Sequence, residues 1–516
     1  MRNIPIRETD WNMASKTFTG SIIGLDAERV EVEADARPGL TRFYVVGLPD
    51  AMVQEARERV KSAVKHSGFL FPRGTAIVNL APADLRKAGT LYDLPIAVAL
   101  IGLRHPASLA TQHALLAGEL SLDGQLRPIH GSMSLAALAK HCGASEVIVP
   151  RANAKEASLV PGIRVYGAES LSEVVAHLEG RTRLPRTPTQ ILERGLMPRA
   201  FPDFSSVRGQ EQAKRALEIA AAGGHNVLMQ GPPGSGKTLL AHCYPSILPA
   251  LEPEEILEVT RIWSVAGKLD SGKGIMSERP FRTPHHTASG ASLVGGGTVP
   301  RPGEVSIAHR GVLFLDEFPE FARPVLENLR QPLEDGTVTV TRVQQSVTFP
   351  ARFNLIAAMN PCPCGYATDP DHECSCTPMQ IALYRKRISG PLLDRIDLLI
   401  EVPKVKTSSL LDQSDAEASA AIRERVCAAR DKQMGRRGET GVLLNSELPS
   451  QVFRGPFKPH EDARKLLEQA DARYHLSGRS YFRILKVALT IADLSGSARI
   501  TMEHVAEALQ YRQIFE

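Results

Sequence analysis

The sequence predicts an α/β fold with a parallel sheet at the centre of the chain, an α+β region before it and a helical region after it. Within residues 204–405, buried apolar strands alternate with helical patterns, which is typical of a parallel α/β sheet. Residues 1–180 mix short β-rich runs with helical segments. Residues 406–516 show helical periodicity, as in residues 481–495. We therefore expect three domains, with residues 181–203 connecting the first two.

The composition is that of a globular protein with room for a large core. The chain has 516 residues, of which 43% are hydrophobic and 23% charged. A net charge of +4 excludes a chain that is basic throughout but allows local basic patches. No apolar run approaches about 18 residues and the N-terminus lacks the apolar core of a signal peptide, so we expect a cytoplasmic protein without a membrane partner. Seven cysteines, an odd number, indicate reduced thiols or a metal site rather than a disulfide framework.

The elements of the first region follow from short-range patterns. The expected strands are residues 42–46, 75–80 and 146–149, and the expected helices are residues 50–66 and 91–103. The connecting segment, residues 181–203, is rich in arginine and proline. As a flexible coil, it would let one domain pivot on the next.

A glycine-rich loop follows a predicted buried strand at residues 225–230. The loop fits the pattern G-x-x-x-x-G-K-[ST], in which glycines let backbone N–H groups wrap phosphates closely. Lys237 is expected to reach the β- and γ-phosphates, and Thr238 to bind Mg²⁺ at the start of a helix that runs to Ile247. The predicted cofactors are therefore ATP and Mg²⁺. The predicted nucleotide-binding residues are Gly231, Pro232, Pro233, Gly234, Ser235, Gly236, Lys237, Thr238 and Leu239.

Two further buried strands end in polar residues. The first, residues 311–315, is followed by two carboxylates, of which Asp316 is expected to hold Mg²⁺ and Glu317 to polarise the attacking water. A strand that stops at a charged turn is the alternative. The second strand ends at Asn360, directly before Pro361, and a residue that only turns the chain is the alternative to a functional role there.

Several of these motifs resemble the MCM and magnesium-chelatase branch of AAA+ proteins. Residues 390–397 (GPLLDRID) resemble the arginine-finger element of that branch, which implies that Arg395 acts in trans on the ATP of a neighbouring subunit. The resemblance also implies that Asn360 is sensor 1 and that Arg483, at the start of a helix running to Asp493, is sensor 2. A surface salt bridge is the alternative for Arg395, and a solvated helix-end arginine for Arg483. An arginine acting in trans implies an oligomer, and a closed head-to-tail ring is expected.

The block from Pro280 to Phe321 contains the short sequences HHT, GGG, PGE, AHRG and LDEFPEF. This block resembles the magnesium-chelatase-like AAA+ proteins of the ComM/YifB type. The resemblance covers nearly the whole chain. It implies a central AAA+ P-loop NTPase domain over residues 204–405 and a C-terminal helical lid over residues 406–516. It also implies an ATP-dependent hexameric DNA helicase that promotes branch migration during homologous recombination and natural transformation, with single-stranded and branched DNA as partners.

Two other functions compete with this one. The first is the ATPase subunit of a magnesium-chelatase-type metal insertion complex, which resembles residues 204–516 but typically lacks a region like residues 1–180. The second is a non-catalytic, ATP-gated scaffold, which would need none of Lys237, Asp316, Glu317 and Arg395. Both points favour the DNA motor.

The N-terminal region resembles a Lon-protease-like domain of the S5 domain 2 type, through residues 117–129 and 147–153. A working Lon domain needs a Ser nucleophile activated by a Lys. The Ser position falls on Leu91 and the Lys position on residues 133–135, so we expect no peptidase activity. The region also resembles the domain of the RadA recombination protein, which implies a scaffold and a DNA-binding surface. The basic candidates for that surface, which solubility explains equally well, are Arg73, Arg86 and Lys87.

Two segments of the central region are candidate pore elements by the same resemblance. Residues 337–349 read as two strands joined by a tight turn, and Arg342 near the tip is the candidate DNA contact. A phosphate contact of this kind is independent of DNA sequence and weakens steeply with salt. Residues 281–297 are rich in small residues and form the second candidate. His285 and His286 within that segment are expected to be structural.

Four cysteines form two C-x-C pairs, Cys362 with Cys364 and Cys374 with Cys376. In a reducing compartment this pattern predicts a candidate Cys₄ zinc site. The spacing is tighter than the usual C-x₂-C, and free thiols or a redox pair are the alternatives. The remaining cysteines are expected to be inert, namely Cys142, Cys243 and Cys427.

Overall fold

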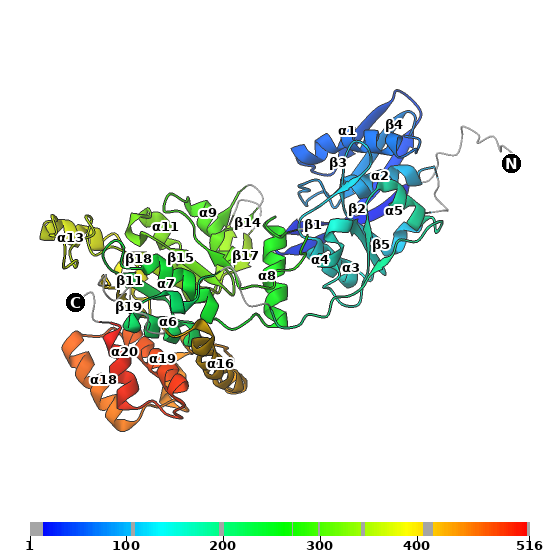
Figure 1. Cartoon of the computed structure of the whole chain (residues 1–516). Helices are drawn as coiled ribbons and strands as arrows, with labels where there is room; N and C mark the ends of the chain where they lie inside the picture. The colour runs from blue at the N-terminus through cyan, green and yellow to red at the C-terminus, as the bar shows by residue number, and fades with distance from the viewer. Residues whose placement is uncertain are drawn as a thin grey trace.

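The computed structural model describes residues 14–104, 109–195, 201–270, 272–297, 300–341, 346–405 and 416–512. Figure 1 shows three parts in chain order: a blue and cyan N-terminal part, a green and yellow central part, and an orange and red helical part. The N-terminal part meets the central part along helix α8 (Pro253–Val265). This order confirms the predicted parallel α/β centre and helical C-terminal region.

A mixed eight-stranded sheet forms the N-terminal part, in the order β10-β9-β8-β5-β1-β2-β4-β3. Strands β1 and β2 pair antiparallel, and β2 alternates charged side chains with the buried Val30, Val32 and Ala34. Because side chains alternate between the two faces of a strand, this pattern places one face in the core. The strands are β1 (Ser15–Ile23), β2 (Asp26–Arg37), β3 (Arg42–Val46), β4 (Thr75–Ala81), β5 (Ala114–Leu116), β8 (Glu146–Pro150), β9 (Arg164–Ala168) and β10 (Arg186–Thr187), with a separate pair β6 (Glu119–Leu120) and β7 (Leu126–Arg127).

Helices pack against this sheet, and the two that the sequence predicts are confirmed. Helix α1 begins after Asp50, whose carboxylate accepts a hydrogen bond from the N–H of Val53 at 2.9 Å. Such a cap satisfies one of the free N–H groups of the first turn. Helix α2 is buried over its whole length, as its apolar run requires. The helices are α1 (Ala51–His66), α2 (Asp93–Gly102), α3 (Ser132–His141), α4 (Arg151–Ala157) and α5 (Leu171–Leu178), with the 3-10 helix η1 (Thr111–His113).

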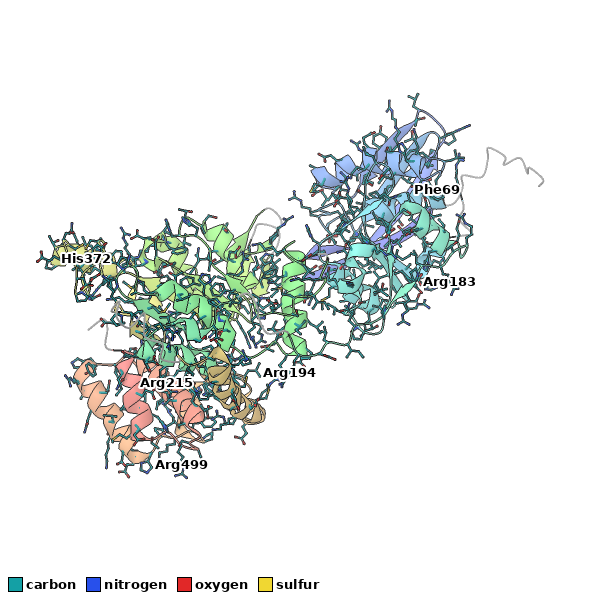
Figure 2. All side chains as sticks on the ribbon, viewed as in Figure 1. Phe69, Arg183, Arg194, Arg215, His372 and Arg499 are labelled. Carbon is teal, nitrogen blue, oxygen red and sulfur yellow. The ribbon has the colours of Figure 1, made fainter. Side chains whose placement is uncertain are left out.

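Part of the predicted linker is held in place. Strand β10 pairs antiparallel with β9 and lies at the edge of the sheet. Further along, the N–H of Gly195 donates to the carbonyl of Leu251 at 2.7 Å, and Arg194 pairs with Glu252 at 3.2 Å. Figure 2 shows Arg194 where the chain reaches the central part. The prediction of a flexible coil is wrong for these residues, because their backbone groups have partners in the neighbouring elements.

Buried polar contacts dock the N-terminal part on α8. The N–H of Gly131 donates to Oγ of Ser264 at 2.8 Å, and this hydroxyl donates to Oε1 of Glu156 at 2.5 Å. Burial raises the pKa of the Glu156 carboxyl. Nearby, Nε of Arg261 donates to the carbonyl of Leu25 at 3.0 Å. Because separating these parts would leave buried polar groups without partners, the contacts oppose free pivoting.

Five parallel strands form the central sheet, in the order β12-β15-β18-β11-β19. All their carboxyl ends therefore lie at one edge and all their amino ends at the other. Ligands of open parallel sheets bind outside the carboxyl ends. The strands are β11 (Val227–Gln230), β12 (Phe281–Arg282), β15 (Val312–Leu315), β18 (Asn354–Met359) and β19 (Leu398–Glu401).

Two core clusters cover the two faces of the central sheet. Val227 and Met229 of β11 enter one cluster with the helices α6, α16 and α19, whereas Leu228 enters the other with the hairpin of β16 and β17. The central helices are α6 (Glu211–Gly223), α7 (Lys237–Cys243), α8, α9 (Gly290–Val294), α10 (Glu304–Ile307), α11 (Arg323–Glu327), α12 (Arg330–Asp335), α13 (Pro378–Arg385) and α14 (Gly390–Leu393). The remaining central elements are the pairs β13 (Gly295–Gly296) with β14 (Arg301–Pro302) and β16 (Thr337–Thr341) with β17 (Ser346–Pro350), and the 3-10 helices η2 (Phe204–Ser206), η3 (Tyr244–Ile247) and η4 (Phe318–Glu320).

The C-terminal part is helical, as predicted. Helix α19 begins at Gly478 rather than at Arg483, because Oγ of Ser477 accepts a hydrogen bond from the N–H of Ser480 at 3.1 Å and caps the helix there. Arg483 therefore lies inside the helix. Over the described ranges, we find no helix with the length and apolarity needed to cross a membrane. The elements are α16 (Ser419–Gly435), α17 (Arg437–Thr440), α18 (Glu461–Tyr474), α19 (Gly478–Ser495), α20 (Met502–Gln510), η5 (Asn445–Glu447) and η6 (Ser450–Arg454).

Candidate active site

The glycine-rich loop lies between β11 and α7, at the carboxyl edge of the central sheet. Gly234 and Gly236 have φ angles of 73° and 92°, a region that side chains other than glycine rarely adopt. Nζ of Lys237 donates to the carbonyls of Gly231 and Pro232 at 2.7 and 2.8 Å, so the ammonium group lies within the loop. Burial lowers the pKa of Lys237 to about 8. A bound phosphate would supply the negative charge that this buried ammonium group lacks.

The two predicted Mg²⁺ ligands are in contact. Oγ1 of Thr238 donates to Oδ2 of Asp316 at 3.0 Å. A hydroxyl and a carboxylate beside a phosphate loop are the oxygen ligands that Mg²⁺ prefers. The residues present therefore fit the metal. Leu239, the last predicted nucleotide contact, is 39% exposed in the first turn of α7.

Glu317 has a partner that sequence reasoning missed. Its carboxylate Oε2 lies 3.1 Å from Nδ1 of His286, and its backbone has a φ angle of 52°. Sequence reasoning treated His286 as structural because no carboxylate stands near it in the chain. The fold brings the two together because β12 and β15 are parallel neighbours, so the segments that follow them meet at one edge.

Asn360 joins the same cluster. It follows β18, and its Oδ1 lies 3.5 Å from Nζ of Lys237. The preceding carbonyl, that of Met359, accepts a hydrogen bond from the N–H of Gly231 at 3.2 Å. The structure thus gathers the predicted phosphate loop, both carboxylates and Asn360 at the carboxyl edge of one sheet.

Arg395 lies at the opposite edge of the sheet. It precedes β19, and its carbonyl accepts a hydrogen bond from Nδ2 of Asn226, which precedes β11. The guanidinium is only 6% exposed; it donates to the carbonyl of Pro391 at 2.6 Å and to the carboxylate of Glu334. Burial and the nearby Arg479 lower the pKa of Arg395. The salt bridge that is the alternative for this residue is present in the chain, and it joins the buried Arg395 side chain to Glu334, whose side chain is 47% exposed.

Arg483 lies at the same edge as Arg395. Its Nη1 is 3.5 Å from Oδ1 of Asp397, and this arginine holds the pKa of that carboxyl well below its usual range. Both arginines line a cavity of about 340 Å³, together with Glu334 and Lys486. Because strands of four residues separate the two edges and each strand residue rises about 3.3 Å, neither arginine reaches Lys237 of its own chain in this conformation.

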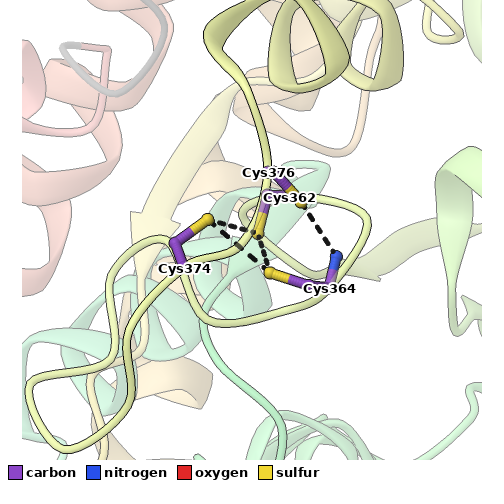
Figure 3. A group of neighbouring side chains, drawn as sticks. All are labelled: Cys362, Cys364, Cys374 and Cys376. Carbon is purple, nitrogen blue, oxygen red and sulfur yellow. Dashed lines mark hydrogen bonds between the residues drawn. The ribbon is translucent and has the colours of Figure 1, made fainter.

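The four cysteines of the C-x-C pairs converge, as Figure 3 shows. Sγ of Cys362 lies 3.3 Å from Sγ of Cys364 and 3.7 Å from Sγ of Cys374, and the last two sulfurs are 3.6 Å apart. Cys376 completes a group whose sulfurs all lie within 4.8 Å of one another. A disulfide requires about 2.05 Å, whereas four sulfurs bound tetrahedrally to zinc at about 2.3 Å lie about 3.8 Å apart. The sulfurs therefore fit zinc.

The structure supports some of the candidate DNA-contact residues as surface residues and not others. The predicted hairpin is confirmed as β16 and β17, but Arg342 at its tip lies outside the described residues. In the N-terminal part Arg73 and Arg86 are exposed. Lys87 is fully buried and donates to the carbonyl of Pro82, so its assignment to a DNA-binding surface is wrong.

Comparison with known proteins extends these observations. Residues 203–410 match the family described as "Magnesium chelatase, subunit ChlI", residues 416–512 match its C-terminal family, and residues 32–153 match "Subunit ChlI of Mg-chelatase". Together, the three matches cover most of the central, helical and N-terminal parts.

Two full-length relatives sharpen the assignment. The chain is 44% identical to the competence protein ComM of Haemophilus influenzae over 502 residues, and 43% identical to protein YifB of Salmonella typhimurium over 499 residues; each alignment covers 96% of both chains. The magnesium-chelatase 38 kDa subunit of Cereibacter sphaeroides is 27% identical over 183 residues, which are 32% of this chain and 54% of that subunit. The chain therefore belongs to the magnesium-chelatase-like AAA+ proteins of the ComM/YifB type.

Proposed function

We propose that this protein is an ATP-dependent, hexameric DNA helicase that promotes branch migration during homologous recombination and natural transformation. The name of its Haemophilus influenzae relative, a competence protein, supports the role in transformation. The observation that carries the proposal is the division of the candidate site residues between two edges of one sheet. Lys237, Thr238 and Asp316 lie at the carboxyl edge, and Arg395 and Arg483 at the amino edge.

This division supports a ring. A protomer that holds ATP at one edge and offers arginines at the other is completed by the next copy of itself in a head-to-tail arrangement. Repeating that contact closes a ring or builds a filament. Family resemblance favours a ring of six subunits. In this ring Arg395 is the finger that stabilises charge on the transferred phosphoryl group, and Arg483 is sensor 2.

DNA is the proposed substrate of the ring. The hairpin of β16 and β17 follows directly on α12, which carries Glu334, the partner of Arg395. A hairpin connected in this way can transmit the state of the ATP site to a strand in the pore. Single-stranded and branched DNA are the proposed ligands, and Arg342 at the tip is the proposed phosphate contact.

A magnesium-chelatase ATPase subunit is the second candidate function. The family descriptions favour it, because all three name a magnesium-chelatase subunit. The relatives that match 96% of this chain are nevertheless ComM and YifB proteins, whereas the Cereibacter sphaeroides subunit matches 32% of it. Stimulation of ATP hydrolysis by branched DNA would favour the motor, and lack of any stimulation by DNA would count against it.

Branch migration is expected to depend on Glu317. On a labelled four-way junction, the wild type should resolve the strands only when ATP and Mg²⁺ are present. Glu317→Gln should bind ATP but lose at least about 100-fold in the rate of migration, because the attacking water is no longer polarised. Glu461→Gln, at an exposed position of α18, is the matched control. Equal migration by the wild type and Glu317→Gln would refute the motor.

The affinity for ATP is expected to fall at alkaline pH. Burial lowers the pKa of Lys237 to about 8, and bound phosphates would raise it by favouring the charged ammonium. The affinity for ATP is therefore expected to be highest below about pH 8 and to decrease above it, by up to about tenfold per pH unit. Equilibrium titration with a fluorescent ATP analogue between about pH 7 and pH 9.5 measures this. A dissociation constant that stays flat over this range would contradict the assignment of Lys237.

We propose zinc as a further cofactor beside ATP and Mg²⁺. Four cysteine sulfurs would fill the tetrahedral coordination of zinc and leave no open position for water or substrate, so the proposed role is structural. Metal analysis of the reduced, full-length protein is expected to find about one zinc ion per chain.

A further inference from the structure

The four-cysteine group lies against the nucleotide site. Cys362 is buried and follows Asn360 by two positions. Gly365 packs on the phosphate loop so closely that a Cβ atom added there would lie 2.8 Å from Cγ and 2.9 Å from Cδ of Pro233. The same Cβ atom would lie 3.9 Å from Cγ of Asn360. One turn of the cysteine loop therefore packs against the phosphate loop and lies close to the candidate sensor.

Besides the cysteines, the contacts that hold the cysteine loop lie near the surface, such as the pairing of Lys404 with Asp371 at 2.9 Å. No helix or strand is present between Asn360 and Pro378, where α13 begins, and most side chains from Tyr366 to Cys376 are at least partly exposed. Figure 2 shows His372, within this loop, at the outer end of the central part. Segments of this length without secondary structure are uncommon in compact domains, and a cross-link is one way to keep such a segment ordered.

The local hydrogen bonds fit such a cross-link. The N–H of Cys364 donates to Sγ of Cys376 at 3.4 Å, and the N–H of Gly365 donates to the carbonyl of Cys362 at 3.0 Å. N–H groups directed at sulfur stabilise thiolates that bind a metal. These bonds also tie the turn at Gly365 to the group of sulfurs.

We propose that the zinc ion held by Cys362, Cys364, Cys374 and Cys376 braces the phosphate loop through the contact of Gly365 with Pro233. In this arrangement metal occupancy sets the affinity for ATP, although the metal touches neither the nucleotide nor Mg²⁺. The inference rests on the proposed zinc and ATP binding. It adds a metal site that influences the ATP site through packing.

The first experiment separates metal binding from ATP binding. Zinc content and the dissociation constant for a fluorescent ATP analogue are measured on full-length wild type and on the double variant Cys374→Ser and Cys376→Ser. These two positions are chosen because Cys362 is buried beside Asn360, where a substitution would itself disturb the site. The variant is expected to lose zinc and to bind the analogue about tenfold more weakly. Cys142→Ser, in the N-terminal part, is the matched control.

The second experiment distorts the contact between Gly365 and Pro233 and keeps the metal. Gly365→Ala introduces a Cβ atom against Pro233, at a φ angle of 88°. The variant is expected to retain zinc and still bind the ATP analogue about tenfold more weakly. Gly143→Ala is the control, because Gly143 has a φ angle of 73° and no heavy atom within 4 Å of the added Cβ. It carries comparable backbone strain without the contact.

Each result bears on a different part of the inference. Absence of zinc from the wild type, together with no sulfur-to-metal absorption band on adding Co²⁺, would overturn the metal site and leave ATP binding intact. If the double cysteine variant lost zinc but bound the ATP analogue with unchanged affinity, the proposed brace alone would be overturned. Failure of the wild type to bind the analogue would overturn the proposed function and the brace with it. Circular dichroism and gel filtration check that the variants are folded.

Discussion

Replacing Lys237 with alanine is expected to lower ATP hydrolysis by the full-length protein at least about 100-fold. The ammonium group lies inside the phosphate loop, donates to the carbonyls of Gly231 and Pro232, and is buried. It is therefore already placed where the β- and γ-phosphates bind, with little reorganisation required. A steady-state assay of phosphate release, with and without single-stranded and branched DNA, measures the loss.

A control variant separates this effect from a general loss of positive charge. Lys458→Ala removes an exposed lysine of the helical part and should hydrolyse ATP at the wild-type rate. Glu317→Gln provides a second comparison, since it should retain the ATP affinity that Lys237→Ala loses. If Lys237→Ala kept more than about a tenth of the wild-type rate, the loop would not be the hydrolytic site.

The sequence predicts the ATP site well because the chemistry there is local. Lys237 and Thr238 belong to one loop, and Asp316 and Asn360 each end a buried strand. In a parallel sheet the carboxyl ends of strands share an edge, so finding the strands is enough to bring these residues together. The contact of Thr238 with Asp316 at 3.0 Å confirms that reasoning.

Contacts between residues far apart in sequence could not be predicted in this way. Nothing in the segment around His286 indicates that it meets Glu317, because the pairing depends on the order of strands in the sheet. The side chain of Lys87 is fully buried, whereas a sequence pattern treats lysine as exposed. The buried contact of Glu156 with Ser264 is equally remote in sequence, and so the docking of the N-terminal part was missed.

Arg395 poses the second large prediction, because in this conformation it lies at the edge of the sheet opposite the ATP site of its own chain. The guanidinium lies at the amino edge of the sheet and binds Glu334 of the same chain. To reach a γ-phosphate it must exchange that carboxylate for the ATP of a neighbouring protomer. A cation delivered to the transferring phosphoryl group contributes about 10³–10⁵ in rate. Arg395→Ala alone is therefore expected to hydrolyse ATP at least about 1,000-fold more slowly than the wild type while still binding it.

Mixing two inactive variants tests whether the arginine acts in trans. Lys237→Ala keeps its finger but lacks a working phosphate loop, and Arg395→Ala has the opposite defect. In equal mixtures that assemble at random, about one contact in four joins an intact loop to an intact finger of the next protomer. ATP hydrolysis should therefore recover to about a quarter of the wild-type rate. Recovery requires exchange of subunits, so the mixture is assembled from dissociated protein before ATP is added.

The control replaces Arg395→Ala with Glu317→Gln in the mixture. Glu317 and Lys237 belong to the same edge of one chain, so every site in the mixture lacks either the loop lysine or the glutamate. No recovery is expected there, even though the subunits exchange as before. If the Arg395→Ala mixture also stayed inactive while the two proteins demonstrably formed mixed rings, the finger would have to act within its own chain. The ring argument built on the two edges of the sheet would then fail, because each protomer would carry a complete site.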